Sequence, residues 1–136
     1  MKQIEQIKLA FLWFLIAVGF IFHSLFALDG IFFGADIRLP GTDGSEPAMF
    51  TLAHIFLEIM SLIMVLLTLF IDNKGFAWFN RIWASLICLM NVFHLVATFG
   101  EEPFSLAQII LLSFILTANI VLVVCLWRMQ GNDEYK

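Results

Sequence analysis

Charged residues are scarce in this chain, and their scarcity excludes most soluble folds. Of the 136 residues, 13% are charged and 62% are hydrophobic, and the mean hydropathy is +0.97. Soluble domains are closer to a quarter charged, and a chain of this length cannot bury so much apolar surface in its own core. Seven basic residues against eleven acidic ones also exclude a basic nucleic-acid-binding surface. We therefore expect one membrane-embedded domain that contacts the lipid bilayer and binds no nucleic acid.

Cysteine is also nearly absent, which bears on disulfide bonding. The two cysteines, Cys88 and Cys125, both lie inside apolar runs. In the topology expected below they differ in depth by about ten residues, or roughly 15 Å at the helical rise. A disulfide cannot bridge that distance, so we interpret both residues as packing residues.

Four long apolar segments dominate what the sequence does contain. Each is close to the ~20 residues that an α-helix needs to cross a bilayer, and we place them at 7–28, 48–71, 77–99 and 104–127. An outer loop, 29–47, joins the first two, and short connections join the others, so neighbouring helices should be antiparallel. The prediction is an all-α integral membrane four-helix bundle, up-down-up-down, with residues 1–136 forming a single domain.

Basic residues are distributed unevenly between the two ends of this bundle. Arg38 lies at the end that carries the outer loop, and the other six lie at the opposite end: Lys2, Lys8, Lys74, Arg81, Arg128 and Lys136. The positive-inside rule then places both termini in the cytoplasm, and we expect the inner (cytoplasmic) membrane of a bacterium. Trp78 and Trp83, with Arg81, are interpreted as interface anchors of the third segment.

A polar stripe interrupts the second apolar segment. Thr51, His54, Glu58 and Ser61 follow one another at spacings of three and four residues. Side chains at these spacings lie on the same face of a helix. A carboxylic acid inside a span is costly and normally faces the bundle interior, so Glu58 is the strongest candidate for a functional residue.

The three histidines of the chain occur on three different segments at nearly the same expected depth. His23 precedes the outer end of the first segment, His54 follows the start of the second, and His94 precedes the end of the third. Because the segments alternate in direction, the histidines should lie about 6–9 Å below the outer helix ends, level with Gln108. Asn91 and Glu58 come one turn deeper. We expect these residues to line a polar pocket open to the outer side.

Imidazoles and a carboxylate at one level favour a transition-metal site. His23, His54, His94 and Glu58 are the predicted ligands of zinc, copper or iron, with Asn91 and Gln108 as hydrogen-bonding neighbours of those ligands. Glu58 is also the candidate catalytic general base, acting on a metal-bound water. Haem b is an alternative cofactor, held by two of the histidines, and Gly19 would leave room for a macrocycle edge one turn from His23.

Two other interpretations need no cofactor. His54, Glu58 and His94 could form a proton relay in a small proton-coupled transporter or in an enzyme with a lipid pocket that uses Glu58. Alternatively, the polar layer only holds helices together, in a non-catalytic subunit or scaffold of a membrane complex or in a homo-oligomer. Neither the residues nor their spacing decides whether the protein is an enzyme.

Overall fold

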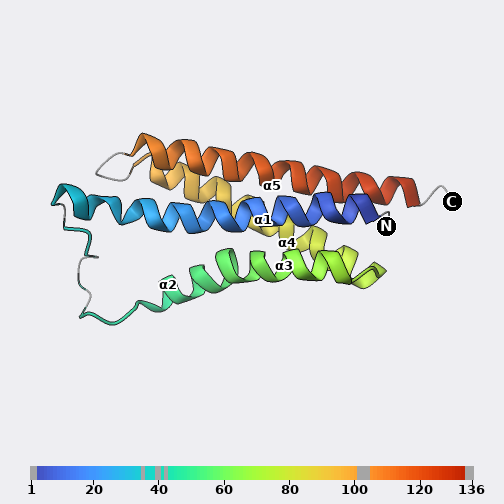
Figure 1. Ribbon diagram of the computed structural model, residues 1–136, viewed down its shortest axis with the longest axis horizontal. Helices are drawn as coiled ribbons and strands as arrows, with labels where there is room; N and C mark the ends of the chain where they lie inside the picture. The colour runs from blue at the N-terminus through green and yellow to red at the C-terminus, as the bar shows by residue number, and fades with distance from the viewer. Residues whose placement is uncertain (1–2, 35, 39–40, 42, 101–104, 134–136) are drawn as a thin grey trace.

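The protein is a bundle of long apolar helices, shown here by a computed structural model (Figure 1). The structure describes residues 3–34, 36–38, 41, 43–100 and 105–133. Within them, four helical segments are long and apolar enough to cross a membrane: Gln3–Phe33, Ala48–Phe70, Lys74–Thr98 and Leu106–Met129. The predicted all-α fold with four packed apolar helices is confirmed, and the predicted spans agree with these to within a few residues, apart from the two ends of the first.

The first segment is longer than predicted at both ends. Helix α1 runs over Gln3–Ala27, and the 3-10 helix η1 extends it over Asp29–Phe33. Gly34 then takes a left-handed conformation with φ of 73°, and its N–H bonds back to the carbonyls of Gly30 and Ile31. A left-handed residue with no Cβ penalty is a common way to end a helix, so the chain leaves the bundle at Gly34.

The second segment is a single helix that changes type in its middle. It begins as α2, Ala48–Ala53, continues as the π-helix η2, His54–Ile59, and ends as α3, Met60–Phe70. The N–H of Met60 bonds to the carbonyl of Ile55, five residues back, which is the π pattern. The stretch that contains His54 and Glu58 therefore holds one residue more than an α-helix would need to cover it.

The last two helices are continuous and of similar length. Helix α4 spans Lys74–Thr98, and α5 spans Leu106–Asp133. A tight turn precedes α4, and the Asn73 side chain caps it by accepting a hydrogen bond from the backbone N–H of Phe76 at 2.8 Å. Asparagine is among the preferred residues at this position.

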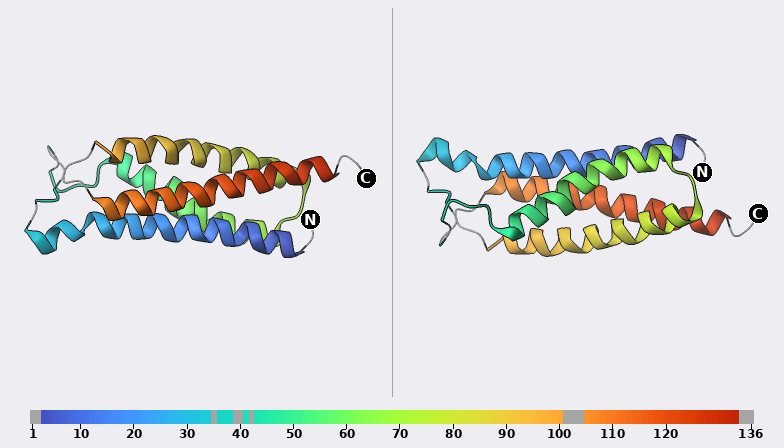
Figure 2. Two further views of the ribbon diagram at one scale, coloured as in Figure 1. Left: turned by 90° about the horizontal axis from the view of Figure 1, so that it is seen from above. Right: turned by 90° about the horizontal axis from the view of Figure 1, so that it is seen from below.

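The bundle has one wide side, between the consecutive helices α3 and α4. The backbones of α1 and α5, of α4 and α5, and of α1 and α3 approach closely, whereas the consecutive helices α3 and α4 do so at few points. Figures 1 and 2 show α2 diverging from α1 at the end of the bundle that carries η1. We call that end the loop end. The opposite end, where both chain termini lie (Figure 1), is called the terminal end.

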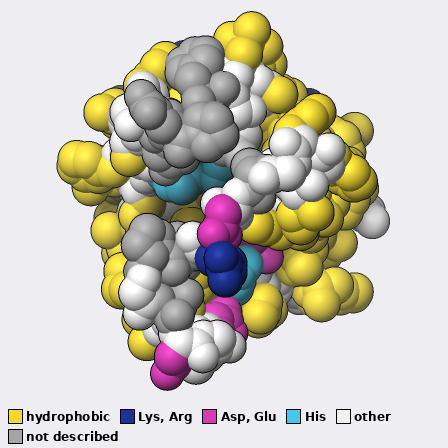
Figure 3. All heavy atoms as spheres, turned by 90° about the vertical axis from the view of Figure 1, so that its left-hand side faces the viewer, with side chains coloured by type: hydrophobic (Ala, Val, Ile, Leu, Met, Phe, Trp, Pro, Cys, Tyr) yellow, Lys and Arg dark blue, Asp and Glu magenta, His cyan; other side chains and the backbone are white. Residues whose placement is uncertain are grey.

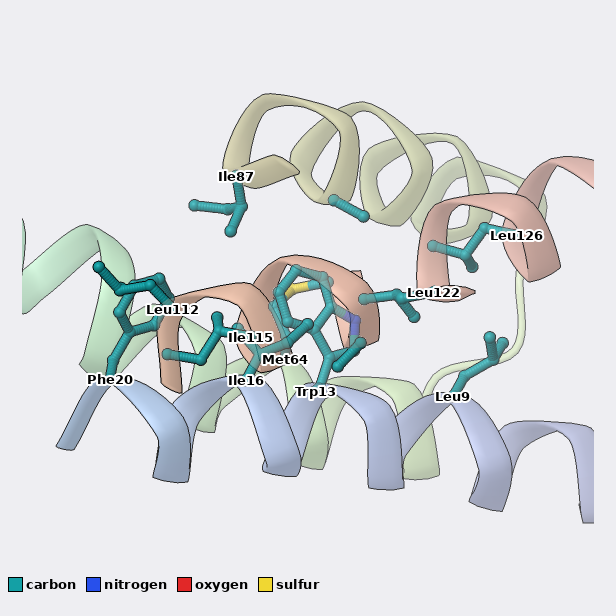
Figure 4. Close-up of a cluster of buried hydrophobic side chains, with 12 residues drawn as sticks. Leu9, Trp13, Ile16, Phe20, Met64, Ile87, Leu112, Ile115, Leu122 and Leu126 are labelled. Atoms are coloured by element: carbon teal, nitrogen blue, oxygen red, sulfur yellow. The ribbon is translucent and has the colours of Figure 1, made fainter. Parts of the chain in front are cut away.

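A tryptophan fills the centre of the bundle next to this wide side. Trp13 of α1 is fully buried among Ile16, Met64 and Leu122 (Figure 4). Its indole N–H donates to Asn80 Oδ1 at 2.9 Å, across the bundle on α4. Large aromatic side chains supply much buried area and need a partner for the N–H group when buried, and Asn80 provides that partner.

Gly19 allows the close approach of α1 and α5. A Cβ added to Gly19 would lie 2.5 Å from Cγ1 of Ile115, which is fully buried on α5. That separation is far inside van der Waals contact. The space beside Gly19 is therefore filled by Ile115. This is the space in which the sequence predicts room for a macrocycle edge, one turn from His23.

Candidate functional site

Two histidines meet near the loop end of the bundle. His23 of α1 and His94 of α4 approach with their Nε2 atoms 2.9 Å apart, and their rings are perpendicular with centroids 4.8 Å apart. The two helices do not pack closely along their backbones, so the imidazoles reach across the bundle to make this contact. The common depth that the sequence predicts for these two residues agrees with their meeting.

The contact limits the protonation of the pair. A nitrogen–nitrogen hydrogen bond needs one N–H and one lone pair, so the two facing Nε2 atoms share a single proton. His23 Nδ1 is buried and has no hydrogen-bond partner among the described residues. Because an unsatisfied acceptor is better tolerated than an unsatisfied donor, we assign the shared proton to His23 Nε2 and the other proton to His94 Nδ1. The pair can then hold one excess proton between its four nitrogens.

Glu58 forms a second unit, on the π-helix η2. Its Oε1 atom accepts a hydrogen bond from the Ser24 hydroxyl at 2.7 Å and lies 3.1 Å from His54 Nδ1. With both contacts on Oε1, a proton on this carboxylic acid belongs on Oε2. The predicted partnership of His54 and Glu58 is therefore present, and an α1 residue joins it.

The two units are adjacent along α1. His23 belongs to the first unit and Ser24, the next residue, to the second. Seen from the loop end, histidine side chains are visible between hydrophobic ones, and one lies beside acidic and basic side chains (Figure 3). The side chain of His54 is 43% exposed and that of Glu58 is 21% exposed. The Glu58 unit is therefore not enclosed by the bundle.

The π-helix η2 sets the direction in which the side chains of this part of the second segment point. Glu58 is half-buried, and the buried face of α3 continues below it through Ser61, Met64 and Thr68. Isolated π turns occur often at functional sites, because the extra residue changes the direction of the side chains that precede it. The predicted stripe divides accordingly: Thr51 is exposed, His54 and Glu58 form the polar unit, and Ser61 is fully buried.

The remaining predicted site residues lie elsewhere or make other contacts. Asn91 donates from Nδ2 to Asn119 Oδ1 at 2.9 Å, deep in the bundle, and Asn119 Nδ2 donates to the Ala84 carbonyl at 3.3 Å. Gln108 is half-buried near the start of α5, where its backbone N–H is 3.4 Å from the Ser105 hydroxyl. Asn91 thus joins two helices, and its described hydrogen bond does not go to a histidine.

The charged loop close to the site is solvated. Arg38 pairs with Asp36 through two side-chain contacts of 2.7 and 2.9 Å, and these lower the pKa of the Asp36 carboxyl and raise the pKa of Arg38. Hydrogen bonds from Ser45 lower the pKa of Asp43 in the same way. Ser45 therefore bonds within the loop, and α2 begins at Ala48 with Pro47 at its N-cap.

The predicted ligands do not form one metal-binding cluster. Among the described residues, no group of three or more His, Cys, Asp or Glu side chains has a geometry that could hold a metal ion. The four candidates are split between the His23–His94 pair and the His54–Glu58 pair.

Sequence reasoning missed Ser24 and did not predict the packing of Trp83. The sequence does show the Ser24 hydroxyl beside His23, near the outer end of an apolar span. Its depth alone did not predict the hydrogen bond to Glu58. Trp83, predicted as an interface anchor, packs against aromatic side chains. Its ring lies 5.8 Å from Phe56 and 6.0 Å from Phe79, and its N–H is buried. The ring therefore fills the wide side of the bundle between η2 and α4.

Comparison with protein-family models, with curated proteins and with solved structures finds no match to this chain.

Proposed function

We propose that this small membrane protein takes up and releases protons at its loop end, and that Glu58 and the His23–His94 pair are the groups that carry them. The observation behind this proposal is the arrangement of four ionisable side chains in two units. His23 and His94 are hydrogen-bonded to each other, Glu58 lies 3.1 Å from His54 and accepts a hydrogen bond from Ser24, and consecutive residues of α1 join the two units. Ionisable groups within spans typically serve proton relays or transport pathways.

The units suit this role because each offers a place for one excess proton. A second excess proton on the His23–His94 pair would place two N–H groups against each other, so the pair titrates as one unit. Glu58 accepts two contacts on Oε1 and keeps Oε2 available for a proton. A proton-coupled transporter or an enzyme that uses Glu58 as its acid or base would both use such a site.

Proton binding is tested by nuclear magnetic resonance of ¹⁵N-histidine-labelled protein in nanodiscs. We expect His23 and His94 to titrate together, and His94→Gln to leave His23 with a changed, independent titration. Asp29→Asn, which removes a carboxylate from the loop end without touching either unit, should change neither curve. Independent titration of the two histidines in the unmodified protein would contradict the coupled pair.

Proton transfer is tested in proteoliposomes with a trapped pH-sensitive dye. Under an imposed pH gradient, Glu58→Gln should reduce the protein-dependent proton flux at least tenfold, and Asp29→Asn should leave it unchanged. The Gln side chain keeps the size of Glu58 and its acceptor oxygen but carries no titratable proton. Equal flux in the two variants would remove Glu58 from the pathway.

A transition-metal ion is a second candidate, and the convergence of two ring nitrogens favours it. Two imidazoles on a tetrahedral ion at about 2.0–2.1 Å stand about 3.3 Å apart, and the Nε2 atoms of His23 and His94 are 2.9 Å apart. A small outward movement would admit an ion, with Glu58 and His54 as the next available donors. Such an ion would act there as a Lewis acid or a redox centre. Ile115 beside Gly19 and the short nitrogen–nitrogen distance make haem the less favoured group.

Metal analysis of the purified protein decides between the two candidates. Stoichiometric zinc, copper or iron that is lost in His23→Ala and His94→Ala would establish a metal site, and a Soret absorbance band would identify haem. Metal content near zero, together with the coupled histidine titration, is what the proton proposal expects. The purely structural alternative, in which the polar layer only joins helices, predicts neither proton flux nor metal.

A further inference from the structure

An arginine at the terminal end of the bundle is held between α4 and α5. The Nε atom of Arg81 donates to the Leu126 carbonyl at 2.9 Å, and the residue is only 8% exposed. Its guanidinium carbon lies 5.5 Å from the centre of the Trp78 ring. A backbone carbonyl and an indole therefore fix the guanidinium from two sides, which orients the remaining nitrogens before any ligand arrives.

Two further side chains complete this cluster. The Trp127 ring stands perpendicular to the Trp78 ring at 6.0 Å, and its N–H donates to the Ser85 hydroxyl at 3.3 Å. The Ser85 hydroxyl in turn donates to the Arg81 carbonyl at 2.8 Å. We call Trp78, Arg81, Ser85 and Trp127 the arginine cluster. It lies at the opposite end of the bundle from the histidines, so its role is separate from the proposed proton site.

The charge of Arg81 is not balanced by a carboxylate within the described part of the chain. Ion pairs between described residues join Asp36 to Arg38 and Glu58 to His54, both at the loop end. A guanidinium carries five N–H donors, and the one on Nε is used. A positive charge within a span is expensive unless an anion or a set of acceptors compensates it. The terminal nitrogens are not among the enclosed groups without a partner in the described residues, so they are accessible to an anionic ligand.

The surroundings specify the chemistry of that ligand. The guanidinium fork matches the oxygens of a phosphate in a bidentate geometry. Trp78 is 47% exposed and Trp127 is 45% exposed on the outside of the helices, where acyl chains run, and indoles of this kind lie at headgroup level. Basic sites between transmembrane helices near one membrane surface bind anionic headgroups.

We propose that the arginine cluster binds the phosphate of an anionic phospholipid, with Arg81 on the phosphate and the two indoles against the upper acyl chains. A free phosphate would engage the same guanidinium but would gain nothing from the indoles. The proposal therefore assigns the phosphate to a lipid, and the experiment separates the two sources.

Native mass spectrometry of the detergent-purified protein, titrated with phosphatidylglycerol or phosphatidylcholine, tests the site. A lost charge-assisted hydrogen bond should weaken phosphatidylglycerol binding about tenfold in Arg81→Gln. Arg128→Gln removes the same charge from an exposed position at the same end and should change the affinity less than threefold. Phosphatidylcholine carries its phosphate beside a choline cation, so it should bind the unmodified protein more weakly than phosphatidylglycerol, and Arg81→Gln should weaken its binding less.

Two further arms keep the result interpretable. Arg81→Lys retains the charge but loses the fork and the Nε donor, so it should weaken phosphatidylglycerol binding severalfold even if Arg81→Gln does not fold. Excess inorganic phosphate should not displace the bound lipid. Equal effects of Arg81→Gln and Arg128→Gln, an Arg81→Lys variant with full affinity, no preference for phosphatidylglycerol, or displacement by inorganic phosphate would each overturn the proposal.

Discussion

At the scale of single residues, burial separates polar contacts that hold helices together from those that can carry chemistry. Asn91 and Asn119 are both almost completely buried and satisfy each other. His54 and Glu58 are partly exposed at the loop end. From the sequence, both sets were polar residues inside spans, and depth alone could not distinguish them. The distinction depends on the rotation of each helix, which only the packed bundle fixes.

The Asn91–Asn119 contact gives the first prediction. Asn119→Ala should lower the free energy of unfolding by about 1–2 kcal/mol, because it leaves a buried amide without a partner. Replacing both residues by leucine should recover part of the loss, since no polar group then stays unpaired. Thr117→Val, at an exposed position on the same helix, should have little effect. Equilibrium unfolding in mixed micelles measures all three, and an Asn119→Ala variant as stable as Thr117→Val would contradict the expectation.

The Asp36–Arg38 pair gives a pH-dependent prediction outside the membrane. Because Arg38 lowers the pKa of the Asp36 carboxyl, the contact is fully present above the ordinary pKa of an aspartate and is lost as the pH falls through the lowered value. Arg38→Gln should therefore raise the midpoint of the Asp36 titration, followed by the chemical shift of its carboxyl carbon. Both side chains are well exposed, so we expect no change in Tm. An unchanged midpoint would show that the contact is absent in solution.

At the scale of elements, the sequence predicted the four apolar helices but not the π-helix. Spacing places His54 and Glu58 on one face in either helix type, so the predicted pair survives. The periodicity of an apolar run does not show one extra residue in a turn, because nearly every position is apolar. That extra residue sets the direction from which Glu58 approaches Ser24, which explains why Ser24 was missed.

The role of the π-helix is tested by removing its extra residue. Deletion of Ile59 should return the segment to an α-helix and rotate the preceding residues by about 100° relative to α3. Circular dichroism should show the same helix content, while the hydrogen bond between Ser24 and Glu58 should be lost. In a background without Cys88 and Cys125, a short thiol cross-linker should join Ser24→Cys to Glu58→Cys only when Ile59 is present.

A matched cysteine pair below the deletion controls for a general change of fold. Asn80 Nδ2 donates to Thr68 Oγ1 at 3.3 Å, between α4 and α3. Thr68→Cys and Asn80→Cys should therefore cross-link with and without Ile59. Cross-linking of positions 24 and 58 that persists after the deletion would show that the π-helix does not position Glu58.

At the scale of the whole molecule, the bundle has two chemically different ends. The loop end holds the histidines, Glu58 and an acidic loop, and the terminal end holds the arginine cluster and most of the basic residues that the structure describes. The distribution of basic residues predicts that the terminal end faces the cytoplasm. This prediction needs helices that cross a bilayer, and four helical segments are long enough to do so. The cross-bundle contacts and the wide side between α3 and α4 were not predictable, since they arise from how large side chains such as Trp13 pack.

The orientation of the bundle in the membrane decides from which compartment protons reach the proposed site. Cysteine labelling measures this orientation directly. In a background without Cys88 and Cys125, we introduce Ser45→Cys at the loop end or Lys74→Cys at the terminal end. A membrane-impermeant maleimide added to intact bacterial cells with a permeable outer membrane should label Ser45→Cys, and Lys74→Cys only after the inner membrane is opened, because the basic end stays in the cytoplasm. The reverse pattern would place Glu58 and the histidines on the cytoplasmic side. Protons would then enter from the cytoplasm, and the arginine cluster would meet the lipids of the outer leaflet.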